Sequence, residues 1–494
     1  MRIDAKPCAR EAPGIASGGI LNVCGMLRVM LIACVATGCA VIPEKPGFKD
    51  VAHMVTKRTG QRIEWTRGGP EDRAVSRAID EMLAAELDAG EAVQIALLNN
   101  RELQATYEDL HLAQATLVQA GLLNNPVFTT GIGFPLDGGS LDLSFGIVQD
   151  FLSILYRPLR REIATARFEA TKLRIAESVI ELAARVQAAF YQVQADQQRI
   201  GFLRQVGRAT AASAEAARRL HDAGNITDLD LVREQALYQE ARLALITAQS
   251  RLIQNRERLN ALMGLWGKDT QWIIAPRLAD LPATPEAPPR QTVERRAIEA
   301  NLALKATRRN IEAAAAVLGF TDATALIPLL KSGVDAEREK GEWEVGPVVA
   351  LPLPVFNQGR ARVAAAQAEL RRARQLYWAQ AAEIRATVRA ARATAISARN
   401  RARHVQNVLL PLYTRAVDST QLQYNAMQVG VFALLAVKQQ QIAAGLRYIE
   451  TLLEYWLART ALEQILNGSL ADIEITPMAE IPAGNIPGIS IPAE

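Results

Sequence analysis

The chain has 494 residues, of which 49% are hydrophobic and only 5% aromatic, and its formal net charge is +4. This weak charge excludes a strongly basic nucleic-acid-binding surface, so we expect no nucleic-acid partner. Ala, Leu, Arg, Gln and Glu dominate the composition, as is typical of long helices. The cysteines are Cys8, Cys24, Cys34 and Cys39, so no disulfide framework or thiolate metal site is possible beyond residue 39.

The first forty residues predict export. An apolar run at 29–36 is too short to span a bilayer permanently but suits the core of a signal peptide. The run ends in Ala-Thr-Gly-Cys39, which resembles a bacterial lipoprotein cleavage site. We therefore predict a signal peptide at 1–38 and acylation of Cys39, with Met1 or Met26 as the true start. The alternative is a plain secretory peptide with an incidental cysteine.

Comparison of the chain with itself shows an internal repeat of two copies, at a spacing of 203 to 204 residues. Residues 221–226 align with 424–429, and 259–264 align with 463–468. Each copy predicts a helix, two strands, a long helix, a tight turn and a returning helix. The predicted division is an N-terminal extension at 39–85, a first repeat at 86–264, a collar linker at 265–290, a second repeat at 291–468 and a Pro-rich tail at 469–494.

The predicted strands have one apolar and one polar face. Large apolar residues alternate with small or polar ones through a hairpin at 127–148. The second repeat offers weaker strands at 320–330 and 343–351, around a charged loop at 331–341. Such strands suit a membrane barrel with lipid outside and water inside. Four strands cannot close a barrel or hide their edges, so we expect a trimer with twelve strands.

Long helices follow the strands of each repeat. Gly207 and Pro411 occupy corresponding places in the two longest helices and predict a bend in each. Apolar residues of one returning helix recur every seven positions, from Leu231 to Leu259 and, on the opposite flank, from Leu229 to Leu243. A helix with an apolar stripe, or seam, on each of two flanks needs a neighbour on each side, as in a helical cylinder. The predicted helices span 91–120, 157–222, 229–263, 291–318, 360–426 and 431–467.

The two repeats, the segment Asp-Ala-Gly-Asn-Ile-Thr-Asp-Leu-Asp-Leu at 222–231 and the segment Leu-Pro-Leu-Pro-Val-Phe-Asn-Gln-Gly-Arg at 351–360 together resemble the TolC-type outer-membrane efflux family. This resemblance implies a mainly α-helical fold with a small β part. Long antiparallel helical hairpins would form an α-barrel, and four strands per chain would contribute to a trimeric transmembrane β-barrel. The implied partners are two further copies of the chain, a periplasmic adaptor, an inner-membrane pump and outer-membrane lipid.

The resemblance also implies that the turns of the two long hairpins contact the adaptor and narrow the pore. Family members often place acidic residues after the second turn, but this chain has Ala433 and Ala436 there. The constriction is therefore expected at Asp228 and Asp230. A purely structural role competes, with glycines supplying turn geometry and Thr227 or Asp228 capping a helix. The predicted adaptor contacts are Gly224, Asn225, Ile226, Thr227, Asp228, Val429, Gly430, Val431 and Phe432.

Enzymatic chemistry has little support in the sequence. The histidines at 53, 111, 221 and 404 are scattered, without metal-ligand spacing or a phosphate-binding glycine loop. We expect a lipid-anchored outer-membrane duct with a periplasmic helical tunnel, without cofactor, metal site or catalysis. It would export small toxic compounds or metal ions. A duct for secreted proteins and a coiled-coil scaffold without a pore remain open alternatives.

Overall fold

The computed structural model describes residues 43–134, 141–283, 289–339 and 342–471. Two compact units are distinguished, Met1–Glu44 and Lys45–Glu494. Only Pro43 and Glu44 of the first unit are described, so the predicted signal peptide and Cys39 lie outside the described residues. Among the described helices, none is both long and apolar enough to cross a bilayer.

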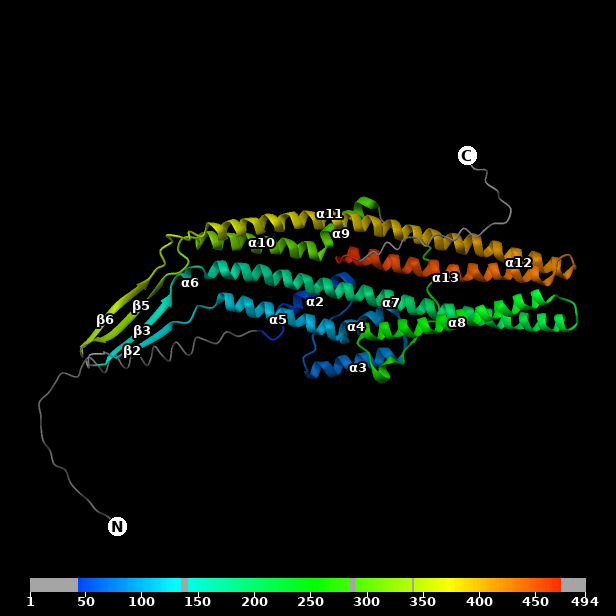
Figure 1. The fold of residues 1–494 in the computed structure, drawn as a ribbon, viewed down its shortest axis with the longest axis horizontal. Coiled ribbons are helices and arrows are strands. Elements are labelled where there is room, and N and C mark those ends of the chain that lie inside the picture. Colours follow the sequence, from blue (N-terminus) through cyan, green and yellow to red (C-terminus); the bar gives the residue numbers. More distant parts are fainter. Residues whose placement is uncertain (1–42, 135–140, 284–288, 340–341, 472–494) are drawn as a thin grey trace, which may run out of the picture. The chain divides into compact units, whose positions relative to one another are not determined.

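The second unit consists of long helices that run side by side, with a four-stranded sheet at one end (Figure 1). At the other end lie the two turns that connect the long helices into hairpins. An N-terminal segment with α2 (Phe48–Thr59) and α3 (Pro70–Ala84) leads to β1 (Glu86–Leu87). The first copy then comprises α4 (Ala89–Asn99), α5 (Arg101–Gly121), β2 (Val127–Gly133), β3 (Asp142–Asp150), α6 (Leu152–Leu155), α7 (Arg157–Asp222) and α8 (Asp228–Met263).

A short connection with β4 (Ile273–Ile274), which pairs in parallel with β1, leads to the second copy. This copy comprises α9 (Arg290–Ala300), α10 (Leu302–Ala323), β5 (Lys331–Glu339), β6 (Glu342–Ala350), α11 (Arg360–His404), a π-helical turn (Val405–Leu409), α12 (Leu410–Asn425) and α13 (Val431–Asn467). The second copy thus repeats the order of the first, except that α6 has no counterpart and the second long helix is divided.

One strand of the second copy lies later than the sequence predicted. Residues 320–323 belong to the end of α10, and β5 occupies the stretch expected as a charged loop. The prediction of a strand at 320–330 is therefore wrong. The charge of this stretch favoured a loop, although Asp335 and Glu337 alternate with Val334 and Ala336 as in a strand. The period of two was the stronger signal, because the acidic residues Asp335 and Glu337 occupy one face.

The helices before each sheet are broken where the sequence predicted continuous helices at 91–120 and 291–318. Asn100 separates α4 from α5, and Asn301 separates α9 from α10. Each asparagine side chain accepts a hydrogen bond from a backbone N–H three residues on, at 2.9 Å in the first copy and 2.7 Å in the second. Both are helix N-caps, which restart the helix in a new direction.

Of the two predicted bends, only one interrupts its helix. Before Pro411, the backbone passes through the π-helical turn at Val405–Leu409. Proline has no N–H, so the carbonyl of Asn407, four residues earlier, loses its α-helical partner. At Gly207 the helix α7 continues without a break. The second long helix, predicted at 360–426, is therefore divided, whereas α7 coincides with the predicted range.

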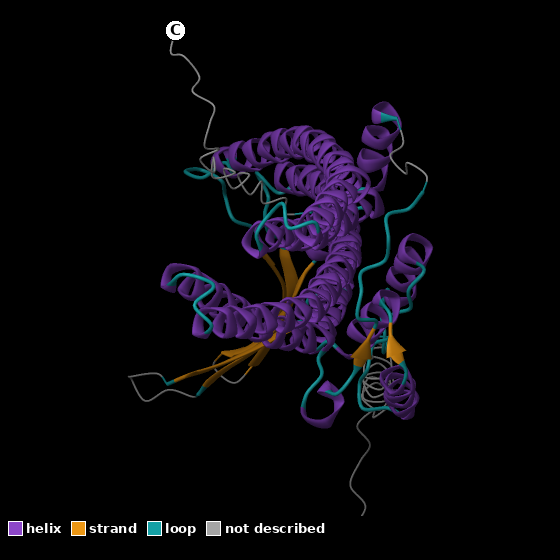
Figure 2. Cartoon of the chain, turned by 90° about the vertical axis from the view of Figure 1, so that its right-hand side faces the viewer, coloured by secondary structure: helices purple, strands orange, loops and turns teal. Residues whose placement is uncertain are grey.

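The helices form one curved layer, as the end-on view shows (Figure 2). Near the sheet the order is α5, α7, α10 and α11, and toward the turns it is α8, α7, α13 and α12. The outer flanks of α5, α11, α8 and α12 are therefore free edges of the layer. On α8, Leu245 and Leu252 pack with Leu203 of α7, whereas Leu229 and Leu243 are 58% and 66% exposed. The second predicted seam is thus an uncovered one.

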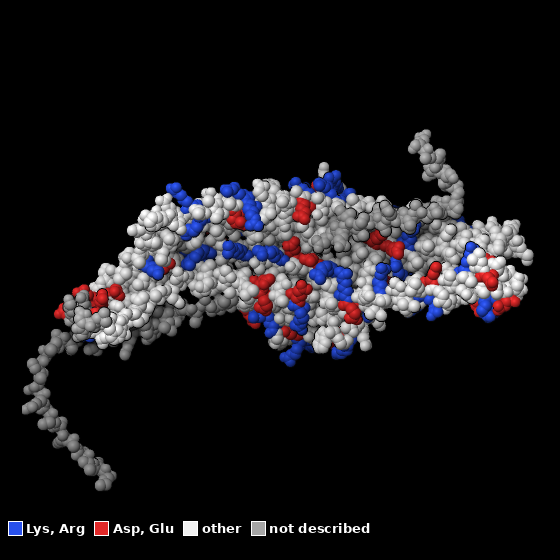
Figure 3. Space-filling view, in the orientation of Figure 1, with Lys and Arg blue, Asp and Glu red and all other residues white. Residues whose placement is uncertain are grey.

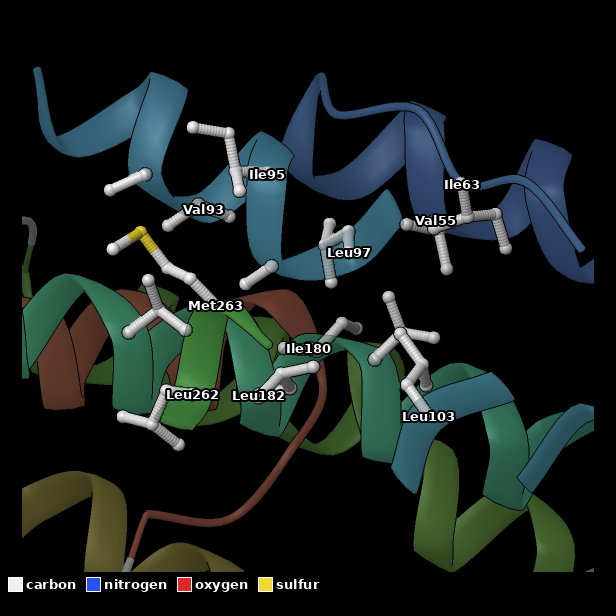
Figure 4. Packing of buried hydrophobic residues seen from close by; sticks show 14 of the residues in the cluster. Val55, Ile63, Val93, Ile95, Leu97, Leu103, Ile180, Leu182, Leu262 and Met263 are labelled. Atoms are coloured by element: carbon white, nitrogen blue, oxygen red, sulfur yellow. The ribbon is translucent and has the colours of Figure 1, made fainter. Parts of the chain in front are cut away.

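The main core lies where the N-terminal segment meets both helices of the first hairpin. Val55 and Ile63 of this segment contribute to the same cluster as Leu97 of α4 and Ile180 of α7 (Figure 4). Trp65 is buried in it and only 1% exposed. The residues predicted as an N-terminal extension are thus part of the collar around the middle of the helices.

Each copy ends in a glycine that packs closely against the backbone at the break between the first two helices of that copy. Gly264 after α8 has φ +69°, and Gly468 after α13 has φ +106°. A Cβ on Gly264 would lie 2.7 Å from the carbonyl oxygen of Asn99, and one on Gly468 would lie 2.5 Å from that of Ala300. Arg58 of α2 also donates to the carbonyl of Ala300 at 2.9 Å. Only glycine fits both the backbone conformation and the space at these two positions.

Candidate functional site: the hairpin turns and the two-faced sheet

The first turn, at 223–227, is closed by its own side chains. Gly224 has φ +72°, which glycine adopts without strain. The hydroxyl of Thr227 accepts a hydrogen bond from the backbone N–H of Asp230 at 3.3 Å and donates to its carboxylate at 2.8 Å. A ring nitrogen of His221 lies 2.6 Å from a carboxylate oxygen of Asp228. Both predicted gate aspartates are therefore engaged in holding the turn.

The second turn, at 426–430, uses a different residue for the same backbone conformation. Met427, which aligns with Gly224, has φ +59° and is 94% exposed. Gly430 has φ −76° and precedes α13 without a side-chain cap. The interpretation that Gly430 supplies turn geometry is therefore wrong. The adaptor-contact residues predicted around it lie at the same end of the unit as the first turn (Figure 1).

A groove of about 320 Å³ lies beside these turns, between the first hairpin and the start of α13. Its α7 wall consists of small residues spaced three and four apart, a pattern that sequence reasoning missed although it is visible in the sequence. Glu234 is only 5% exposed there and accepts a hydrogen bond from the hydroxyl of Ser213 at 2.6 Å. The lining comprises Ala209, Ala212, Ser213, Ala216, Ala217, Leu220, Glu234, Val431, Phe432 and Leu435.

Charges at the end of α7 are mostly paired with one another. Glu215 accepts hydrogen bonds from Arg218 at 3.0 Å and from Arg219 at 2.9 Å. These two guanidinium groups lower the pKa of Glu215 to about 2. Arg218 also binds Asp222 at 3.1 Å. Such exposed pairs contribute little to stability.

The sheet has the order β2-β3-β5-β6, and all three pairings are antiparallel. Directly opposed residues of such strands point to the same face. Stacked rings of Phe128, Phe145 and Trp343 lie on one face, with centroids 6.3 and 6.0 Å apart. The rows of this apolar face are Ile132, Leu143, Arg338 and Trp343; Thr130, Phe145, Ala336 and Val345; and Phe128, Ile147, Val334 and Pro347.

The opposite face of the sheet is acidic. Ser144, Glu337 and Glu344 form one of its rows, so two carboxylates stand directly opposite each other on β5 and β6. Asp335 lies in the next row, and Asp142 lies at the end of β3. Acidic groups gather at the end of the sheet farthest from the helices (Figure 3). Like charges in opposed positions destabilise a sheet, so this arrangement suits water-filled, cation-rich surroundings.

None of these carboxylates has an ion-pair partner among the described residues, although Lys331 lies at the other end of β5. In the same part of the chain, no group of three or more His, Cys, Asp or Glu side chains is placed to hold a metal ion.

Comparison with known proteins places this architecture in a known class. Residues 92–265 match the family described as outer membrane efflux protein. The cobalt-zinc-cadmium resistance protein CzcC of Cupriavidus metallidurans is 22% identical over 404 residues, which cover 78% of this chain and 90% of CzcC.

Two solved outer-membrane channels have a similar fold. CmeC of Campylobacter jejuni aligns with a TM-score of 0.66 and 13% identity over 78% of this chain and 87% of CmeC. MtrE of Neisseria gonorrhoeae, in its open state, aligns with a TM-score of 0.62 and 16% identity over 77% of this chain and 89% of MtrE.

These findings confirm the resemblance to TolC-type outer-membrane efflux proteins. Its mainly helical fold with a small β part is confirmed as well. Proteins of this family and fold are channels.

Proposed function

We propose that this protein is the outer-membrane exit duct of a tripartite export system, and that its cargo is cationic, with metal ions as the favoured class. It would act as a homotrimer that receives cargo from an inner-membrane pump through a periplasmic adaptor, without catalysing a reaction. The two-faced sheet with open edges carries this proposal, because it combines a lipid-compatible face with an acidic one.

Closure by further copies of the chain is supported by its free edges. β2 and β6 are the outer strands of the sheet and have unpaired backbone groups. The free helix edges carry exposed apolar side chains, among them Ile253 on α8, Trp378 on α11 and Leu422 on α12, each more than 60% exposed. Three copies would supply twelve strands and would pair α8 with α12, and α5 with α11, of the next copy.

A cationic cargo is supported by the acidic face and by the relative from Cupriavidus. CzcC is described as a cobalt-zinc-cadmium resistance protein. In a closed barrel of three copies, Asp335, Glu337 and Glu344 of each chain would together place nine carboxylates along the bore. Acidic rings in a narrow, water-filled passage concentrate cations and repel anions.

Single-channel conductance of the purified protein in a planar bilayer, combined with its native mass, tests the duct. We expect a trimer that forms stable pores. A monomer that is released from membranes by carbonate and never conducts would reject the duct and favour the pore-free scaffold. Loss of secreted proteins, without loss of metal tolerance, in a strain lacking the gene would favour the protein-secretion duct.

The groove beside the turns is the proposed adaptor-docking surface. Its row of small residues on α7 permits the close approach of a partner helix, and Phe432 offers an apolar anchor. Photo-cross-linking from Ala216 or Phe432 should capture the adaptor in cells. The same probe at Ala382, an exposed residue midway along α11, serves as the control. Capture from position 382 alone would place the adaptor elsewhere.

The gate at Asp228 and Asp230 is also a proposal. Replacing both by Asn should change the conductance if their charges narrow the pore in a three-fold ring. His221→Phe removes the partner of Asp228 but keeps both carboxylates, so it separates turn stability from pore charge. Equal conductance in the wild type and the double-Asn variant would leave the aspartates with a purely structural role.

Acylation of Cys39 is supported by the reach of the tether. A Cβ on Gly47 would lie 2.9 Å from both Phe168 and Lys172, so the start of α2 lies against α7 at this height. That point is roughly 16–22 Å along α7 from its first residue. The eight residues from Cys39 to Gly47 can span roughly 26–29 Å, enough to reach the level of the sheet. Intact mass of the mature protein should show the acyl groups and lose them in Cys39→Ser; equal masses, allowing for the substitution, would reject the anchor.

A further inference from the structure

The two helices that begin next to the sheet have basic first turns. Arg157, Arg160 and Arg161 open α7, and Arg360 and Arg362 open α11. The first turns of these two fully described helices contain no acidic residue. Basic groups lie where the helices leave the sheet, next to an uncharged zone that precedes the acidic end (Figure 3). The same feature therefore occurs in both copies of the repeat.

These positions are unfavourable for the helices themselves. The N-terminal end of a helix carries partial positive charge, so cations are disfavoured there and acidic residues are preferred. The helices α4 and α8 follow that preference, with Glu91 and Asp228 in their first turns. Something other than helix stability must therefore account for the arginines of α7 and α11.

No acidic residue in the described part of the chain neutralises these arginines. None of the five forms an ion pair with a residue that the structure describes. Arg160 donates to the backbone carbonyl of Ser153 at 2.8 Å, and Arg362 to that of Ala325 at 3.4 Å. Asp150 and Glu162 are the nearest acidic residues along the chain on the α7 side. A basic excess therefore remains at this level, and Lys331 at the start of β5 adds to it.

A belt of exposed apolar side chains separates the arginines from the strands. Phe151 and Leu155 precede α7, and Leu353, Val355 and Phe356 precede α11. All five are at least half exposed, and Phe356 is fully so. The belt continues the apolar face of the sheet toward the helices. Apolar side chains followed at once by arginines fit a bilayer surface, where carbon chains lie among lipid tails and charged ends reach the headgroups.

We propose that the five arginines form a binding surface for the headgroups of anionic phospholipids in the periplasmic leaflet of the outer membrane. The apolar belt would lie among the acyl chains just above them. This inference rests on the proposed function, because it requires the sheet to lie in that membrane. It assigns the helix starts a role in fixing the depth of the duct in the bilayer.

Retention of phosphatidylglycerol by the detergent-purified full-length protein, measured by native mass spectrometry, tests the surface. The variant is Arg157→Gln with Arg360→Gln. A basic residue near an anionic surface contributes about 1 kcal/mol, which corresponds to about fivefold in affinity for each arginine removed. Arg233→Gln with Arg415→Gln is the matched control, since both residues are exposed and belong to the turn-side helices α8 and α12. The control should retain the lipid as the wild type does.

Equal retention of phosphatidylglycerol by the variant and the wild type would overturn the proposal, as would an equal loss in the control. Retention of phosphatidylcholine should be weaker and insensitive to every substitution; equal affinity for the two lipids would also overturn it. Pore formation is measured on the same samples. A wild type that retains phosphatidylglycerol but never conducts would reject the duct, a result distinct from the failure of the lipid surface.

Discussion

Replacing Glu337 and Glu344 by Gln should reduce the cation-to-anion permeability ratio of the reconstituted channel by about tenfold. This is the lower end of the enrichment that a charged cleft gives to counter-ions. The two carboxylates stand directly opposite each other on the acidic face. Reversal potentials in a salt gradient measure the ratio. The effect should shrink in 1 M salt, where the screening length is only about 3 Å.

The same double variant should fold at least as well as the wild type, because it removes a repulsion between opposed like charges. Thermal unfolding therefore separates lost selectivity from lost structure. Glu86→Gln with Glu102→Gln, two exposed carboxylates at the level of the collar, is the matched control. An unchanged permeability ratio in the Glu337 and Glu344 variant, or an equal fall in the control, would remove the acidic face from the account of selectivity.

Gly264→Ala and Gly468→Ala should each destabilise the protein by roughly 2–5 kcal/mol. Part of this cost, about 1–2 kcal/mol, comes from placing a side chain in the left-handed conformation. The remainder, about 1–3 kcal/mol, comes from the overlap of the new Cβ with the carbonyls of Asn99 and Ala300. Denaturant unfolding followed by helical circular dichroism measures the loss.

Gly224→Ala separates the two costs. Its φ of +72° is equally left-handed, but no atom lies within 4 Å of the added Cβ. We expect a loss of only about 1–2 kcal/mol, and Met427 shows that a side chain is accepted at the aligned position. If all three variants lost the same amount, backbone conformation alone would account for the effect, and the close fit at the ends of the two copies would be irrelevant.

Much of the helical architecture could be predicted from the sequence because periodicity and repetition report it directly. The predicted range of the longest helix coincides with α7, and the alternation of apolar residues predicted the two-faced hairpin of β2 and β3. The breaks at Asn100 and Asn301 were missed, because an asparagine inside a helical pattern is a cap only when the chain changes direction there. The strand β5 was missed because its charges were given more weight than its alternation.

The candidate site was predicted less completely than the fold. Sequence reasoning placed the turn residues at one end, but it could not show that Asp228 is tied to His221 and Asp230 to Thr227. It also missed the acidic row of Glu337 and Glu344, because that row exists only through the register of β5 and β6. Contacts between segments that are distant in sequence carry this information, and no local pattern records them.

The unpaired edges of β2 and β6 also bear on the order in which the copies assemble. A single newly exported chain would present two unsatisfied strand edges and an oily face to the periplasm, where any extended polypeptide could add to them. Association of the helical edges before the strands form would shorten that exposure. We therefore expect the helical parts of the copies to meet first, so that the barrel is completed only as it enters the membrane.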